Sequence, residues 1–179
     1  MSNRPAHLTS PVSHHDHADG PADAPVTLVE YGDFECSHCG QAYPIVKELQ
    51  ERLRGRLRFV FRNFPLTHSH PHALVAAEAA EAAGAQQKFW EMHDTLFENQ
   101  RRLDDRHLVS YAARVGLDAS RFAADMESHA HLERVEQQFN GGVDAGVHGT
   151  PTFFINGVRH DASWDLETML DVLRSHVKK

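Results

Sequence analysis

Apolar residues follow a strand-like pattern near the start of the chain. Residues 26–31 are almost continuously apolar, and residues 56–61 carry a large apolar side chain at every second position. Both patterns are typical of β-strands. Between them, apolar residues recur at helical spacing over 41–53, and Gly55 follows as a helix-ending residue. We therefore expect a right-handed strand–helix–strand unit with parallel strands.

Helical patterns fill the middle of the chain, from His72 to Val147. They predict helices over 72–83, 86–99, 104–115, 120–126 and about 128–147. Gly141-Gly142 is a potential break in the last of these. No other period occurs in this stretch, so it is expected to form a separate helical block.

Strand character returns near the end of the chain. Residues 152–155 and 158–160 are predicted strands, and the Asn156-Gly157 pair between them is a strong hairpin signal. An amphipathic helix is expected over 165–177. The order of elements predicts an α/β fold with a central mixed sheet flanked by helices and interrupted by an inserted helical domain.

The same patterns divide the chain into three parts. The predicted parts are a mobile, His- and Pro-rich leader over 1–24, a core over 25–66 and 148–179, and a helical insertion over 67–147. The leader is assigned because it has no apolar periodicity.

Charge and composition limit the classes of binding partner and the cellular location that we expect. The net charge is −7, and no Lys/Arg cluster with interleaved aromatic residues is present, so nucleic acid is not an expected partner. The first 25 residues contain no apolar run typical of a signal peptide, and no stretch approaches the roughly 20 apolar residues that span a bilayer. We expect a cytoplasmic chain without a membrane segment.

The candidate chemistry lies in the two cysteines, which both fall in Cys36-Ser37-His38-Cys39. This motif stands between a predicted strand and a predicted helix. The unpaired N–H groups of the helix start favour a Cys36 thiolate, and His38 adds a further donor or positive charge. Cys39, one turn into the helix, is expected to be shielded and protonated. The pattern predicts a partly exposed nucleophile, Cys36, and a resolving thiol, Cys39.

Other uses of this motif stay open on the residues alone. A structural disulfide would close too short a loop to constrain the chain much. A zinc site would need outside histidines besides Cys36 and Cys39, since a closed site takes four ligands. A non-catalytic binding or metal-trafficking module and the reduction of a small substrate such as a peroxide are further alternatives.

Two segments together carry a family resemblance. Glu30-Tyr31-Gly32-Asp33-Phe34-Glu35-Cys36-Ser37-His38-Cys39 and Gly149-Thr150-Pro151-Thr152-Phe153-Phe154-Ile155-Asn156-Gly157 resemble the DsbA-like branch of the thioredoxin superfamily. In that branch a helical insertion interrupts the thioredoxin-like fold. The resemblance covers about residues 25–177. It is especially close to the thioredoxin-like domains found alone or attached to NhaA-type sodium/proton antiporters.

The resemblance implies a thiol-disulfide oxidoreductase that needs no cofactor and works through a mixed disulfide on Cys36. It implies that Pro151 is a cis-proline facing the dithiol and that Thr150 offers its backbone to a substrate strand. Glu30 matches a buried acid that relays the proton of the resolving cysteine; an edge-exposed Glu30 is the alternative. Ser37 departs from the proline of well-known relatives, so their redox potentials do not carry over.

The expected partners are cysteine-containing proteins or peptides and a redox-recycling partner, with the chain a monomer or weak dimer. Phe34, beside the nucleophile, is expected to help form the substrate groove, although packing under the loop is an alternative. The histidine runs His14–His17 and His68–His72 are expected to be solvated rather than to form specific metal sites.

Overall fold

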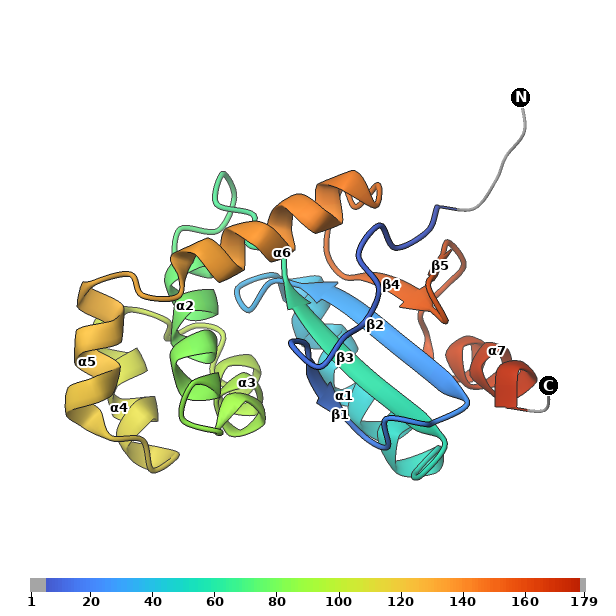
Figure 1. Ribbon diagram of the computed structural model, residues 1–179, viewed down its shortest axis with the longest axis horizontal. Coiled ribbons are helices and arrows are strands. Elements are labelled where there is room, and N and C mark those ends of the chain that lie inside the picture. Colours follow the sequence, from blue (N-terminus) through green and yellow to red (C-terminus); the bar gives the residue numbers. More distant parts are fainter. Residues whose placement is uncertain (1–5, 178–179) are drawn as a thin grey trace.

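A mixed sheet forms the centre of the computed structural model, which describes residues 6–177 (Figure 1). Its strands within this range have the order β1-β3-β2-β4-β5. They are β1 (His17–Asp19), β2 (Val26–Gly32), β3 (Leu57–Asn63), β4 (Thr152–Ile155) and β5 (Val158–His160). β2 and β3 are parallel and joined by helix α1 (Ser37–Arg52), whereas the other pairs are antiparallel. The predicted mixed sheet is confirmed.

Helices cover both faces of this sheet. Side chains alternate along the strands, so Leu28 of β2 lies in one apolar cluster and Val29 in the other. The first cluster includes residues of α1 and of α7 (Leu166–Val177), and Phe139 of α6 (Leu132–Asp144) packs against the second. Figure 1 shows α6 crossing one face while α1 lies behind the other.

The helices between β3 and β4 pack mainly around one alanine-rich helix. They are α2 (Ala73–Gly84), α3 (Phe89–Glu98), α4 (Asp105–Arg114), α5 (Ala119–Glu127) and α6. Nearly all of α2 is buried, because its small side chains let neighbouring helices approach closely. α6 runs through Gly141-Gly142 without a break. A Cβ at Gly142 would lie 2.7 Å from the Phe64 ring, so the glycine allows the helix to approach the sheet.

The segment before β2 differs from the prediction. A mobile leader over 1–24 is wrong for residues 6–24, because β1 pairs with β3 and His7 forms a bridge with Val158 of β5. Residues 1–5 lie outside the described range. Sequence periodicity missed the segment because polar contacts, which have no period, hold much of it.

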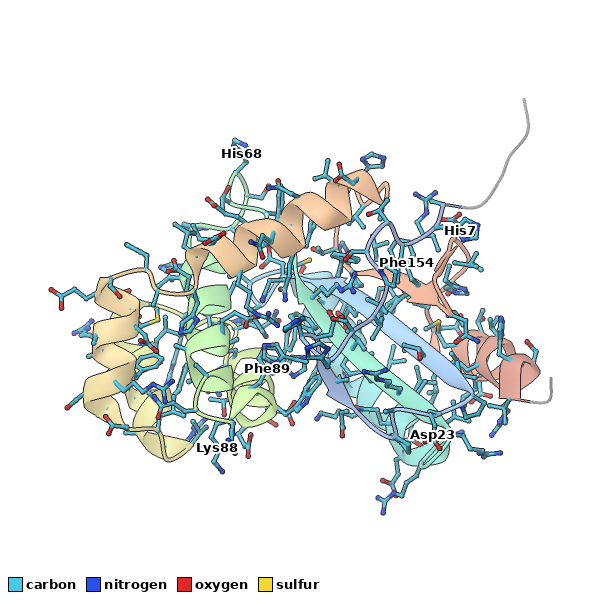
Figure 2. The ribbon with its side chains drawn as sticks, viewed as in Figure 1. His7, Asp23, His68, Lys88, Phe89 and Phe154 are labelled. Atoms are coloured by element: carbon cyan, nitrogen blue, oxygen red, sulfur yellow. The ribbon has the colours of Figure 1, made fainter. Side chains whose placement is uncertain are left out.

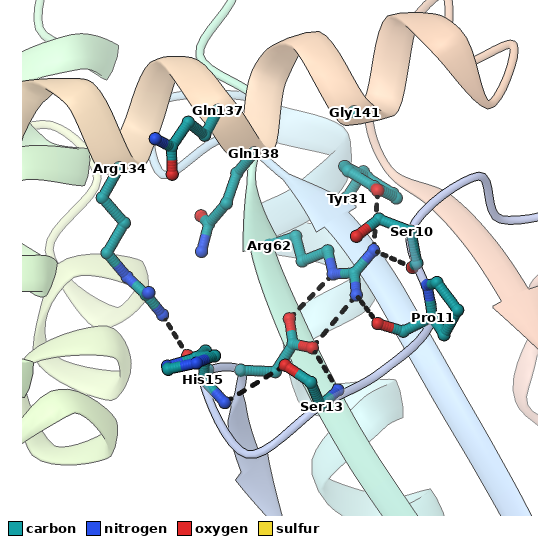
Figure 3. A pocket seen from close by; sticks show the side chains of 11 residues that line it. Ser10, Pro11, Ser13, His15, Tyr31, Arg62, Arg134, Gln137, Gln138 and Gly141 are labelled. Atoms are coloured by element: carbon teal, nitrogen blue, oxygen red, sulfur yellow. Dashed lines mark hydrogen bonds and ion pairs between the residues drawn. The ribbon is translucent and has the colours of Figure 1, made fainter.

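Arg62 of β3 is the main anchor of this segment (Figure 3). Its guanidinium donates to both carboxylate oxygens of Asp16, at 2.8 and 3.0 Å, and to the carbonyl oxygens of Ser10 and Pro11. It also donates to the Tyr31 hydroxyl at 3.0 Å. The side chains of Arg62 and Asp16 are only 5% and 9% exposed. Arg62 therefore fixes the N-terminal segment across the sheet.

Glu81 of α2 adds a second anchor. Its buried carboxylate accepts hydrogen bonds from His17 at 2.8 Å, Arg134 at 2.6 Å and Asn63 at 2.8 Å. Burial opposes its charge, but His17 and Arg134 hold the pKa of Glu81 below its ordinary value. This network joins the N-terminal segment, the helical block and the sheet.

Among the described residues, no helix is both long enough and apolar enough to span a membrane.

Candidate active site

The two cysteines lie at the N-terminus of α1. Cys36 is the N-cap residue with an extended backbone, and Gly40 N–H donates to its carbonyl oxygen at 3.0 Å. Both thiols are reduced. Cys39 is fully buried, and Cys36 is 5% exposed. The expected partly exposed nucleophile is therefore more enclosed than the sequence indicated, although it remains the more accessible of the two.

The environments of the two thiols favour opposite protonation states. A hydrogen bond from the Cys39 thiol is the largest cause that lowers the pKa of Cys36 to about 5, against the opposing effect of burial. The N–H groups of Cys39 and His38 contribute in the same direction. Burial raises the pKa of Cys39 well above its ordinary value. At neutral pH, Cys36 is the thiolate and Cys39 the thiol.

The loop before β4 covers Cys36. The Cys36 sulfur lies 3.5 Å from the Thr150 carbonyl oxygen, and the Thr150–Pro151 peptide bond is cis. The Thr150 hydroxyl oxygen is buried and has no hydrogen-bond partner within the described part of the chain. Two segments over a hundred residues apart thus meet at the reactive sulfur.

Glu30 lies inside the sheet, below the dithiol. It is 2% exposed and sits on the central strand β2 between β3 and β4, so the alternative of an edge-exposed side chain is wrong. Its Oε1 atom has no hydrogen-bond partner among residues 6–177. Burial, followed by the negative charge of Cys36, raises the pKa of Glu30 to about 8. The carboxyl group therefore holds a proton near neutral pH, close to the thiols.

The remaining predicted residues fall into two groups. Ser37 and His38 are exposed in the first turn of α1, beside the reactive sulfur. Phe34 is only 1% exposed and packs against Phe61 and Phe97, with ring centroids 5.1 and 4.9 Å away. The prediction that Phe34 lines the substrate groove is wrong, because its ring anchors the active-site loop in the core.

The helical block contributes residues that the sequence did not identify as part of the site. Gln100 donates to the carbonyl oxygens of Phe34 at 2.9 Å and of Cys36 at 2.8 Å. His70 contacts Asp33 and His72 contacts Glu35, at 2.7 and 2.9 Å. The run His68–His72 was a visible signal for the two histidines. No motif marks Gln100, since its contacts are with backbone atoms far away in the sequence.

A hollow of about 450 Å³ adjoins the loop that covers Cys36. Its lining includes Thr150, Pro151, His148, His160 and Trp164. A second hollow, of about 420 Å³, lies between the N-terminal segment and α6 (Figure 3). Neither cysteine lines either hollow. Of the two, only the first includes residues of the loop over Cys36.

The described residues 6–177 contain no group of three or more His, Cys, Asp or Glu side chains arranged to hold a metal ion. In the first histidine run, Asp16 and His17 are engaged by Arg62 and Glu81. The second run is not simply solvated as expected, because His70 and His72 contact the carboxylates beside the dithiol.

Comparisons with known proteins agree with this geometry. A family model described as thioredoxin matches residues 13–174. The Na(+)/H(+) antiporter NhaA 1 of Salinispora arenicola is 49% identical over 154 residues, which are 86% of this chain and 24% of that protein. The antiporter NhaA of Herminiimonas arsenicoxydans is 45% identical over 160 residues, 89% of this chain and 25% of that protein. The chain thus spans about a quarter of the length of these curated relatives.

Solved structures share the fold at lower identity. BdbD from Bacillus subtilis, in its oxidised form, superposes with a TM-score of 0.85 at 22% identity, covering 98% of this chain and 100% of that one. A thioredoxin-like oxidoreductase from Silicibacter pomeroyi superposes with a TM-score of 0.81 at 24% identity, covering 93% and 95%. These similarities extend over the sheet and the helical block together.

Proposed function

Because this chain belongs to the thioredoxin family and has the fold of its DsbA-like members, we propose that it is a thiol-disulfide oxidoreductase acting on cysteine-containing proteins or peptides. The observation that carries the proposal is the asymmetry of the two thiols. Cys36 is held as a thiolate at a helix start, and Cys39 is held as a buried thiol beside it. Two-step disulfide exchange requires one nucleophilic thiolate and one protonated resolving thiol.

In the proposed reaction, the Cys36 thiolate attacks one sulfur of a substrate disulfide. The substrate S–S bond breaks, its second sulfur leaves as a thiolate, and a mixed disulfide forms on Cys36. The mixed disulfide removes the negative charge of Cys36 that helps to raise the Glu30 pKa, so Glu30 can release its own proton. The Glu30 carboxylate then takes the proton of Cys39, and the Cys39 thiolate attacks the Cys36 sulfur. The substrate leaves as a dithiol and the Cys36–Cys39 disulfide remains. The reverse sequence oxidises a substrate dithiol.

The backbone at Thr150 supports the placement of a substrate chain. Its carbonyl oxygen already lies 3.5 Å from the Cys36 sulfur, and the adjoining hollow includes Trp164 and His160. An extended substrate segment would pair with this backbone and place its cysteine over Cys36. Each turnover converts the dithiol, so a second thiol or disulfide partner must restore it.

A glutathione equilibrium tests the proposal and sets the direction of transfer. Stabilising the thiolate stabilises the reduced protein, so we expect a potential above the about −270 mV of thioredoxin and towards the about −120 mV of DsbA. The measurement is the fraction of Cys36–Cys39 disulfide across glutathione buffers, paired with catalysed exchange of a two-cysteine peptide. Failure to exchange any disulfide would refute the proposal.

The first prediction concerns the acidity of Cys36. The thiolate signal in ultraviolet absorbance should titrate with a midpoint near pH 5, since the Cys36 pKa is about 5. Alkylation by iodoacetamide should follow the same curve, and Cys36→Ser should abolish both signals in this range. A midpoint at the ordinary thiol value of about 8.5 would contradict the assigned asymmetry.

The second prediction concerns the mixed disulfide. Cys39→Ala removes the resolving thiol but leaves the nucleophile, so it should accumulate covalent adducts with a disulfide-bonded peptide that wild type reduces and releases. Non-reducing mass spectrometry measures the adduct. Cys36→Ala is the matched control and should capture nothing. Equal capture by the two variants would show that the thiols do not have the proposed unequal roles.

A binding or metal-trafficking module is the alternative from another class. It would predict retained zinc or copper and no disulfide exchange, and the purified chain can be assayed for both. The antiport activity named for the longer relatives is not proposed for this chain, whose own residues support redox chemistry. We keep a cytoplasmic location and a monomer or weak dimer as predictions.

A further inference from the structure

Asp33 is a buried carboxylate that touches both cysteines through its backbone. Its carbonyl oxygen accepts from Cys36 N–H at 3.1 Å, and its own N–H points to the Cys39 sulfur at 3.5 Å. Its side chain is fully buried and accepts from the N–H groups of Glu35 and Leu66, both at 2.8 Å. Any shift of this residue therefore moves the dithiol.

His70 supplies the charged partner of this carboxylate. Its Nδ1 atom lies 2.7 Å from the Asp33 carboxylate, and its side chain is 23% exposed. Within the described chain, no other ion pair reaches Asp33. An unpaired buried carboxylate at this position would be costly and would oppose a thiolate nearby.

The loop that presents His70 is itself fixed. The N–H groups of Ser69 and His70 both donate to the Leu66 carbonyl oxygen at 2.9 Å. Next to it, the backbone N–H of His72 donates to the Glu35 carboxylate at 2.6 Å, and the His72 ring contacts the same carboxylate. The loop thus contacts two carboxylates of the active-site loop, on either side of the buried Phe34.

We propose that His70 is a positioning residue that acts through Asp33 to hold the active-site loop and to favour the Cys36 thiolate. His70 belongs to the predicted helical insertion, so the insertion becomes part of the catalytic apparatus. The inference rests on the proposed thiol-disulfide function and deepens it, because it identifies a source of the unequal acidity of the thiols outside the Cys-x-x-Cys motif.

The electrostatics agree with this geometry. Burial alone would lower the pKa of His70, but the hydrogen bond to Asp33 and the negative charges of Asp33, Cys36 and Glu35 raise it. The imidazole is therefore cationic over the range in which Cys36 titrates. The coupling is reciprocal: a Cys36 thiolate favours protonated His70, and protonated His70 favours the thiolate.

Three variants separate the charge of His70 from its hydrogen bond. His70→Gln keeps a donor for Asp33 but removes the charge, and His70→Phe removes both. His68→Gln is the matched control, because His68 is exposed in the same loop and points away from the molecule (Figure 2). The Cys36 midpoint is measured by thiolate absorbance and by the pH profile of alkylation, with circular dichroism as the check on folding.

We expect His70→Gln to raise the Cys36 midpoint by about one pH unit, and His70→Phe by more, while His68→Gln stays at the wild-type value. The glutathione equilibrium should move towards the disulfide in the same order. An unchanged midpoint in folded His70→Gln would overturn the inference even if His70→Phe fails to fold. A wild-type midpoint near the ordinary thiol value would instead refute the proposed function, so the two failures are distinguishable.

Discussion

Replacing Glu30 with glutamine should remove a contribution to stability that falls steeply with rising pH. The folded-state pKa of Glu30 is raised by burial to about 8 from an ordinary value of 4.5. Between these values the folded protein holds a proton that the unfolded chain has released. The Glu30 contribution to stability therefore falls as pH rises through this window, by about 1.4 kcal/mol per pH unit. The stability lost from this contribution is on the order of 4 kcal/mol at pH 8, and none is lost below pH 4.

The measurement is the free energy of unfolding by urea from pH 4 to pH 9, with the dithiol kept reduced. The stability of wild type minus that of Glu30→Gln should fall across this window, whereas Glu167→Gln, with a 76% exposed side chain, should follow wild type. Parallel profiles for Glu30→Gln and wild type would contradict a raised pKa.

The same variant should slow release of substrate from the mixed disulfide about tenfold or more, since Cys39 loses its proton relay.

Replacing Arg62 with leucine should destabilise the protein by about 3–5 kcal/mol, because it leaves the Asp16 carboxylate, only 9% exposed, without its cation. The carbonyl oxygens of Ser10 and Pro11 and the Tyr31 hydroxyl lose their donor as well. Urea unfolding gives the loss of stability, and limited proteolysis before residue 20 reports release of the N-terminal segment.

The control is Arg54→Leu, because Arg54 also forms an ion pair, with Glu51, but both side chains are mostly exposed. Its removal should cost at most about 1 kcal/mol. Similar losses in the two variants would show that burial of the Arg62–Asp16 pair does not decide its contribution.

Much of the fold could be predicted because it is built from apolar periods. The parallel unit of β2, α1 and β3 and the hairpin of β4 and β5 follow from runs of strand residues and from Asn156-Gly157. Asp104 caps α4 as its sequence predicts, with its side chain accepting from Arg106 and His107 N–H. Such signals are local, so one sequence contains them.

What the sequence did not predict depends on long-range polar contacts. β1 has three residues and no apolar period, and it is held where it is by pairing with β3 and by Arg62. At the site, the cysteine motif was visible. The hydrogen bonds from Gln100 and His70 to the active-site loop could not be predicted, because each joins residues more than thirty positions apart in the sequence. Phe34 was misassigned because its position beside the nucleophile does not reveal which way its ring points.

The N-terminal segment has a consequence for how the folded chain behaves among other copies. An outer strand of a sheet exposes unpaired N–H and C=O groups that can template aggregation. Here the N-terminal segment reaches both borders of the sheet: the three-residue β1 is the outer strand beside β3, and residues 6–8 exchange hydrogen bonds with Gly157 and Arg159 at β5. The longer strand β3 is therefore not an outer strand, and detachment of the segment would uncover β3 and β5 together.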